Sequence, residues 1–257
     1  MTQPVIVLTG QPIWEDTVRR GLEPAYSVVA LSDKSGYVKR LAEMRPALVL
    51  VDGKEADWSY WVTTPKTSPA TRRIPVVLVA SDSRLREAAR SAGADAVIST
   101  SELAVQPAQL VEQYARVIDT ALLEALECGC AETLPPLATE GVAQFNAGHY
   151  YRQHDLFEEQ WVQTDTPIRD LYRAILQVGV AYYQIERGNH RGALKMLLRS
   201  IQWLAPLPDV CQGIDIRQLR LDSEAVRAAL EQMNPADIGH FDSSLFKPIR
   251  LVDPSRA

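Results

Sequence analysis

The sequence predicts an α/β half followed by an all-α half, that is, a doubly wound five-stranded parallel sheet and then a small helical bundle. Three observations predict this fold class. In the first half, short apolar runs without polar alternation are separated by helical patterns, as in parallel strands covered on both faces. After Thr120 these strand-like runs stop. The segments that follow carry apolar residues at helical spacing, which is typical of packed helices.

The expected strands are runs rich in Val, Ile and Leu, at residues 4–10, 26–32, 47–53, 74–81 and 95–100. The expected helices of this half show apolar residues at helical spacing, at residues 14–23, 36–46, 83–94 and 106–126. The segment 53–73 is less regular, with two tryptophans and two prolines. Five strands with crossover helices in about 120 residues predict a doubly wound sheet.

In the second half, helical patterns are expected at residues 140–147, 149–163, 167–187, 190–204 and 222–232. The segment from Gly141 and the segment from Gly179 form a weak internal sequence repeat. This repeat predicts two tetratricopeptide-like helical hairpins. The predicted organisation is therefore an α/β domain at 1–122, a linker at 123–139, a helical domain at 140–235 and an extended tail at 236–257.

Composition narrows the class of protein. Apolar residues make up 46% of the 257 residues and charged residues 23%, as in soluble globular proteins. The formal net charge of -5 disfavours a nucleic-acid partner. The N-terminus lacks the basic and apolar regions of a signal peptide, and no apolar run approaches the roughly 20 residues that span a bilayer. We therefore expect a cytoplasmic protein without membrane contact.

The three cysteines are Cys128, Cys130 and Cys211. An odd count at these spacings predicts no disulfide framework. Cys128 and Cys130 have one residue between them, and no second cysteine or histidine pair lies at zinc-finger distance. They are interpreted as linker or helix-end residues, with metal or redox use as the alternative.

The phrases "RPALVLVDG", "RRIPVVLVAS" and "AGADAVIST" lie in the α/β half, from residue 45 to residue 100. With the order of strands, they resemble the receiver domains of bacterial response regulators, over residues 4 to about 120. The resemblance implies a flavodoxin-like fold and a prokaryotic role in signal transduction. It also implies a phospho-acceptor, because Asp52 stands where the family's aspartate accepts a phosphoryl group.

Other parts of the family's phosphorylation site are replaced. Residues 9–11, where the resemblance implies acidic magnesium ligands, are Thr, Gly and Gln, and Thr100 stands in the lysine position. Ala80 falls on the hydroxyl position, with Ser81 next to it. Without metal ligands and lysine, a phosphoryl group would gain little charge stabilisation. We predict a degenerate receiver used for docking or dimerisation, with phosphorylation of Asp52 as the alternative.

In the helical half, "FNAGHYYRQHDLFEEQW" begins at residue 145, "RAILQVGVAYYQIERGNHRGALKML" begins at residue 173, and "GID" begins at residue 213. These phrases resemble the prokaryotic family catalogued as Domain of Unknown Function 309. That family usually has a glutamate where this chain has Asp155. The resemblance implies a helical architecture and carries no established activity.

The candidate site of the helical half begins with His154, Glu158 and Trp161, which share one face of a helix. On the next expected helix, Arg173 and Gln177 lie four residues apart on one face. A buried amide or carboxylate needs a partner, since an unsatisfied one costs roughly 1–3 kcal/mol. Packing the two helices together would bring these residues into one polar cluster.

Three interpretations of this cluster stay open. It is an interior polar network without a ligand, a pocket for a small polar or anionic ligand held by Arg173 and Gln177, or a metal site with His154 and Glu158 as ligands. The predicted function is non-enzymatic: a regulatory or scaffold protein whose helical domain binds a protein partner or small polar ligand, or self-associates. No cofactor is expected. The alternative is a hydrolase with a divalent metal at His154 and Glu158.

Overall fold

The computed structural model describes residues 3–82, 84–117 and 119–252. The chain divides into two compact units. The first, which we call the N-terminal unit, ends at residue 117, and the second, which we call the helical unit, begins at residue 118. Positions 83 and 118 of the predicted helices, and positions 253–257 of the predicted tail, lie outside the described residues. Within the described residues, no helix is both long and apolar enough to cross a membrane.

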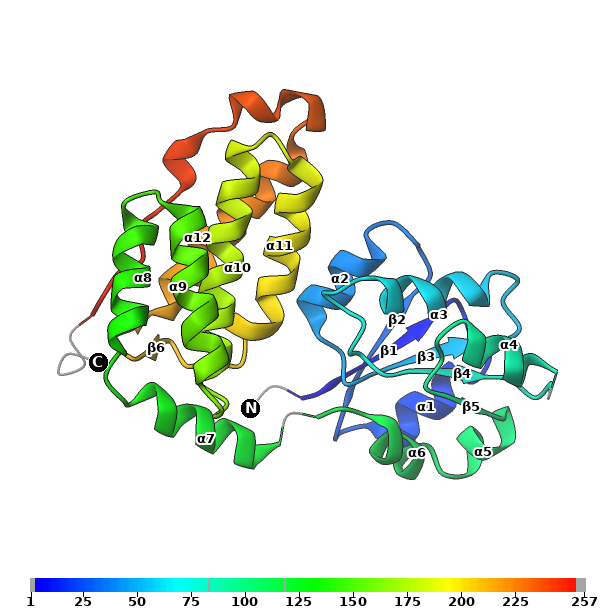
Figure 1. The fold of residues 1–257 in the computed structure, drawn as a ribbon. Coiled ribbons are helices and arrows are strands. Elements are labelled where there is room, and N and C mark those ends of the chain that lie inside the picture. The colour runs from blue at the N-terminus through cyan, green and yellow to red at the C-terminus, as the bar shows by residue number, and fades with distance from the viewer. Residues whose placement is uncertain (1–2, 83, 118, 253–257) are drawn as a thin grey trace. The chain divides into compact units, whose positions relative to one another are not determined.

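The N-terminal unit contains a five-stranded sheet in which every neighbouring pair of strands is parallel (Figure 1). The strands are β1 (Val5–Thr9), β2 (Ser27–Leu31), β3 (Leu48–Asp52), β4 (Val76–Val79) and β5 (Ala96–Ile98). Their order across the sheet is β2-β1-β3-β4-β5, which is the flavodoxin-like order. The predicted fold class of this half is confirmed.

Helices cover both faces of the sheet. They are α1 (Glu15–Leu22), α2 (Tyr37–Met44), α3 (Trp58–Thr67), α4 (Leu85–Ser91), α5 (Thr100–Val105) and α6 (Pro107–Tyr114). Val18 of α1 and Val111 of α6 pack in one core with Leu50 of β3, whereas Trp61 of α3 packs in the other core with Val51. Every residue of β3 is buried, which explains why the strand has no polar alternation.

The described residues of the helical unit form six α-helices, two 3₁₀ turns and one short strand pair. These elements are α7 (Thr120–Cys130), α8 (Pro136–Asn146), α9 (Tyr150–Gln163), α10 (Arg169–Glu186), α11 (His190–Leu204), β6 (Val210–Cys211), β7 (Ile214–Asp215), α12 (Ile216–Gln232), η1 (Pro235–His240) and η2 (Ser243–Leu245). The predicted hairpins are α8–α9 and α10–α11. Gly148 and Gly188 turn them with φ of 78° and 73°, a conformation that favours glycine.

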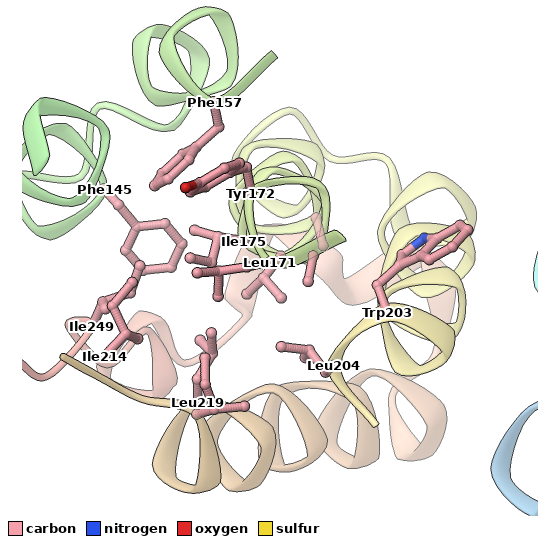
Figure 2. Packing of buried hydrophobic residues seen from close by; sticks show 14 of the residues in the cluster. Phe145, Phe157, Leu171, Tyr172, Ile175, Trp203, Leu204, Ile214, Leu219 and Ile249 are labelled. Atoms are coloured by element: carbon pink, nitrogen blue, oxygen red, sulfur yellow. The ribbon is translucent and has the colours of Figure 1, made fainter. Parts of the chain in front are cut away.

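The core of the helical unit lies among α8, α9, α10, α11 and α12 (Figure 2). Phe157 of α9 and Tyr172 of α10 are both buried in it. The helices approach closely because α8 carries a glycine: a Cβ atom at Gly141 would lie 2.8 Å from the ring of Phe157. The aromatic ring of Phe246, which follows η2, stacks on Tyr182 with 4.4 Å between the ring centroids.

The prediction that the cysteines form no disulfide was wrong for Cys130 and Cys211. Cys130 and Cys211 form a disulfide that joins the end of α7 to β6. Gln212 reinforces this junction: its backbone N–H donates to the carbonyl of Cys130, and its side-chain Oε1 accepts from the hydroxyl of Tyr172 at 2.9 Å. Cysteines 81 residues apart meet only through the tertiary fold, so their spacing gave no indication of the pair. Cys128 is free and exposed.

The predicted boundaries also need correction. The expected helix 106–126 is broken: α6 ends at Tyr114 and α7 begins at Thr120 within the helical unit, so the predicted linker 123–139 contains most of α7. Residues 236–252 of the predicted tail are anchored rather than loosely extended. The side chain of Asn146 accepts from the backbone N–H of Ile249 and donates to its carbonyl, and Ile249 is buried.

Burial of tyrosines predicts that the helical unit loses stability at alkaline pH. Burial raises the pKa of Tyr150 to about 12, and burial also raises the pKa of Tyr182 above its ordinary value. A raised pKa in the folded state gives stability that is present below the unfolded pKa of about 10 and is lost as the pH rises through the folded pKa. We expect each group to lower the free energy of unfolding by up to about 1.4 kcal/mol per pH unit above about pH 10.

Urea unfolding between about pH 9 and about pH 11 measures this loss. The variant Tyr182→Phe should have a shallower pH dependence than the wild-type protein, whereas Tyr151→Phe, at an exposed tyrosine, should not. Equal pH dependences for Tyr182→Phe and the wild-type protein would contradict the prediction.

Candidate functional site

The most distinctive side-chain arrangement of the helical unit is an arginine between two tryptophans. The guanidinium carbon of Arg173 on α10 lies 4.9 Å from the ring centroid of Trp161 on α9 and 4.0 Å from that of Trp203 on α11. Arg169, one turn earlier on α10, lies 5.2 Å from the Trp161 ring. We call these four residues the Arg–Trp cluster. Such distances are those of cation–π contacts.

The chain builds this cluster by antiparallel packing. A short loop after Gln163 reverses the chain, so the end of α9 lies beside the start of α10. The turn at Gly188 then reverses it again, which places the end of α11 beside the same part of α10. Arg169 and Arg173 are four residues apart and therefore lie on one face of α10. The cluster thus collects residues from three helices at one end of the bundle.

The cluster concentrates positive charge where a helix is already positive. Arg169 and Arg173 occupy the first two turns of α10, an 18-residue helix. A helix N-terminus carries the positive end of the helix dipole and ordinarily favours acidic side chains. Asp170 is the acidic residue of that first turn. The guanidinium of Arg169, whose buried Nε has no hydrogen-bond partner among the described residues, makes this end of the helix attractive to an anion.

Two hydrogen-bond donor atoms of the cluster are buried and unsatisfied among the described residues. Nε of Arg169 and Nε1 of Trp161 have no hydrogen-bond partner among the residues that the structure describes. Both atoms are obligatory donors and cannot accept. A buried donor without a partner costs roughly 1–3 kcal/mol, so a bound acceptor would stabilise this arrangement.

Gln177, the predicted neighbour of Arg173, is 3% exposed and its Oε1 has no hydrogen-bond partner within the described part of the chain. The side chain at the contact between α9 and α10 is Gln153, which the sequence prediction did not include. Gln153 is fully buried, and its Nε2 donates to the carbonyl of Tyr150 at 3.0 Å. Gly179 makes room for it, because a Cβ atom there would lie 2.2 Å from that Nε2.

His154 and Glu158 lie on the outer side of α9. Nδ1 of His154 is 3.1 Å from Oδ1 of Asp155, and its ring stacks on Tyr151. Glu158 is exposed. The hydrogen-bond partner of His154 is therefore Asp155 rather than Arg173 or Gln177, so the structure does not gather the four predicted residues around His154. Across the described residues, no three His, Cys, Asp or Glu side chains lie close enough to hold a metal ion.

In the N-terminal unit, Asp52 ends β3 and is 5% exposed. Its Oδ1 accepts the backbone N–H of Lys54 at 3.0 Å, so the side chain caps the turn that follows the strand. At the ends of the next two strands, the hydroxyls of Ser81 and Thr100 are 2.8 Å apart and hydrogen bond to each other. Thr100 therefore places a neutral hydroxyl at the position where phosphorylation of Asp52 would need a positive charge to stabilise the phosphoryl group.

From this geometry we expect no phosphorylation of Asp52. Incubation of the protein with acetyl phosphate and Mg²⁺ should leave its intact mass unchanged, because residues 9–11 after β1 are Thr, Gly and Gln and Thr100 replaces the lysine that would neutralise a phosphoryl group. Mass spectrometry of the wild-type protein and of Asp52→Asn measures this directly. A gain of one phosphoryl group in the wild-type protein that is lost in Asp52→Asn would contradict the expectation.

Part of the helical unit matches a known protein family. Residues 138–196 match the family described as "Domain of unknown function (DUF309)". An uncharacterized protein of Aquifex aeolicus (strain VF5) is 26% identical over 103 residues, which are 40% of this chain and 31% of that protein. The chain thus spans about a third of that relative. The solution structure of a response regulator from Burkholderia multivorans covers 44% of this chain and 92% of its own, with 19% identity and a TM-score of 0.35.

Proposed function

We propose that the helical unit, much of which matches a family of unknown function, is a recognition module that binds an oxyanion through the Arg–Trp cluster. The oxyanion is a carboxylate or a phosphate, carried by a small molecule or by a protein partner. The protein as a whole would then be a non-enzymatic regulatory or scaffold protein. Its N-terminal unit would serve for docking rather than for phosphoryl transfer.

The two buried donors without partners, Nε of Arg169 and Nε1 of Trp161, beside the guanidinium of Arg173, carry this proposal. Indole rings against the guanidinium fix its plane, so its N–H donors are directed along fixed lines. Planar carboxylate and phosphate groups are the usual partners of such donors, often with two parallel hydrogen bonds. Nε of Arg169, which is buried without a partner among the described residues, adds a further donor beside the same ring.

The cluster also explains why the ligand should be a small oxyanion or an acidic group rather than a single-stranded nucleic acid. Cation–π contacts already cover the rings of Trp161 and Trp203, so they offer little free face for bases to stack on. The formal net charge of -5 gives no general attraction for a polyanion. Recognition would therefore rest on a few directed hydrogen bonds.

Calorimetric titration with pyrophosphate and, separately, with glutarate tests the proposal and distinguishes phosphate from carboxylate. We expect binding of at least one probe, and Arg173→Met should weaken it by about 10- to 100-fold, the equivalent of a charge-assisted hydrogen bond of 1.5–3 kcal/mol. The matched control is Arg152→Met, because Arg152 is an exposed arginine of α9 that pairs with Glu140 of α8. Equal affinity in Arg173→Met and Arg152→Met would overturn the proposal.

A further inference from the structure

Helix α11 presents a positive strip to its surroundings. Arg191 and Lys195 lie four residues apart along it, and the helix contains no Asp or Glu. Arg191 and Lys195 are exposed, and neither side chain has an ion pair or a hydrogen bond to another described residue. Leu197 and Leu204 of the same helix are buried in the core. The charged strip is therefore the outer face of an amphipathic helix.

Helix α9 presents a negative strip. Asp155, Glu158 and Glu159 are exposed, and the helix has a single Lys or Arg, which is Arg152. Arg152 is paired with Glu140 of α8 at 3.4 Å and so does not neutralise these acids. Two exposed apolar residues flank the strip along the helix: Tyr151 is 64% exposed and Val162 is 63% exposed. This face of α9 is thus both acidic and partly apolar.

Both strips lie beside the same helix. α10 packs against α9 and against α11, and it runs antiparallel to each, as Figure 1 shows. α9 and α11 consequently run in the same direction on the two sides of α10. A two-fold axis through α10 would place α9 of one copy on α11 of another, and α11 of the first on α9 of the second. Leu176, Val180 and Tyr183, which are half-buried on α10, would lie near that axis.

We infer that the face of the helical unit formed by α9, α10 and α11 binds a second copy of this chain. In the dimer, the acidic strip on α9 of each copy contacts the basic strip on α11 of the other copy. Charge complementarity within one sequence selects this occupant over an unrelated acidic partner, because both halves of the contact are present in every copy. Tyr151 and Val162 would supply apolar contact beside the ion pairs. No other partner is needed to cover either strip.

This inference does not rest on the proposed oxyanion site. The Arg–Trp cluster lies beside the first two turns of α10, as the contact of Trp161 with Arg173 shows. Arg191, in the first turn of α11, follows the opposite end of α10, and Tyr151 contacts Tyr183 near that same end. The charge-reversal variants at Arg191 and Lys195 leave every residue of the Arg–Trp cluster in place, so dimerisation and ligand binding are tested by different substitutions.

Light scattering coupled to size exclusion, on the full chain at low salt, measures the assembly. We expect a dimer that dissociates as salt is raised, since the ion pairs are screened. The double variant Arg191→Glu/Lys195→Glu should weaken dimerisation by more than about 10-fold, and so should Asp155→Lys/Glu158→Lys. Mixing the two variants should restore a heterodimer, because their strips are again complementary. The control Arg217→Glu/Arg250→Glu, at two exposed arginines of the same unit, should remain dimeric.

A wild-type protein that is monomeric at all accessible concentrations would overturn the inference. So would a dimer that both charge-reversed variants retain, or a failure of the mixed variants to associate. Retention of a labelled single-stranded oligonucleotide by monomeric protein, lost in Arg191→Glu/Lys195→Glu, would instead assign the basic strip to nucleic acid and would also overturn it.

Discussion

Replacing Phe157 with alanine is expected to lower the free energy of unfolding of the helical unit by about 4 kcal/mol. Phe157 is fully buried, and its ring fills the space that Gly141 leaves on α8, as Figure 2 shows for the ring's position in the core. Removing the ring loses the favourable free energy of transferring it from water to the core. It also leaves a cavity, because the surrounding helices can relax into the empty space only in part. The loss should therefore be near the upper range for single core substitutions.

The control is Leu221→Ala on α12 of the same unit. Leu221 is 52% exposed, so its truncation should change stability by less than about 1 kcal/mol. Urea unfolding followed by a fluorophore on Cys128, the free exposed cysteine of α7, reports on the helical unit alone. Equal losses for Phe157→Ala and Leu221→Ala would contradict the account of the core.

Breaking the bond between Cys130 and Cys211 is expected to lower the free energy of unfolding of the helical unit by about 4 kcal/mol. The cross-link closes a loop of 81 residues that contains α8, α9, α10 and α11, and the entropy that a cross-link removes from the unfolded chain grows with loop length. Both cysteines are buried, and Gln212 packs beside them with its side-chain Nε2 donating to the carbonyl of Gly129.

Cys211→Ser and reduction with dithiothreitol should give the same lowered urea midpoint, and the two treatments together should have no additional effect. Cys128→Ser is the control, because Cys128 takes no part in the bond and should leave the midpoint unchanged. A wild-type midpoint that is the same with and without dithiothreitol would refute this prediction. Tryptophan fluorescence serves as the probe here, since the labelled cysteine is itself substituted in the control.

Much of the fold could be predicted from the sequence because burial dictates the pattern. Residues of β3 and β4 are buried throughout, so these strands read as unbroken apolar runs. The hairpins of the helical unit were recognisable because glycines with positive φ interrupt amphipathic helices at Gly148 and Gly188. Local signals of this kind do not depend on distant parts of the chain.

The errors arose where distant residues decide the outcome. Helical spacing across residues 106–126 does not show that α6 and α7 pack in different units, and only the tertiary fold brings Cys130 to Cys211. The tail lacks periodicity, yet Asn146 fixes it through hydrogen bonds to Ile249 across more than a hundred residues of chain. No local pattern encodes such contacts.

The candidate site shows the same division. Helical spacing placed Arg173 with Gln177 and Trp161 with His154, and the structure brings Arg173 to Trp161. Trp203 belongs to the site as well, although its position on a third helix made it look like an ordinary core aromatic. A sequence pattern gives the face of one helix, whereas the site depends on how three helices pack.

The indole N–H signal of Trp161 tests the oxyanion site most directly. The chain has five tryptophans, so a ¹H–¹⁵N spectrum contains five indole signals, and Trp161→Phe identifies the relevant one. Because Nε1 of Trp161 is buried without a partner among the described residues, a bound oxyanion should shift that signal in a saturable way during titration with pyrophosphate or glutarate. Arg173→Met should abolish the shift. A Trp161 signal that stays in place at saturating concentrations of both probes would contradict the proposed recognition function.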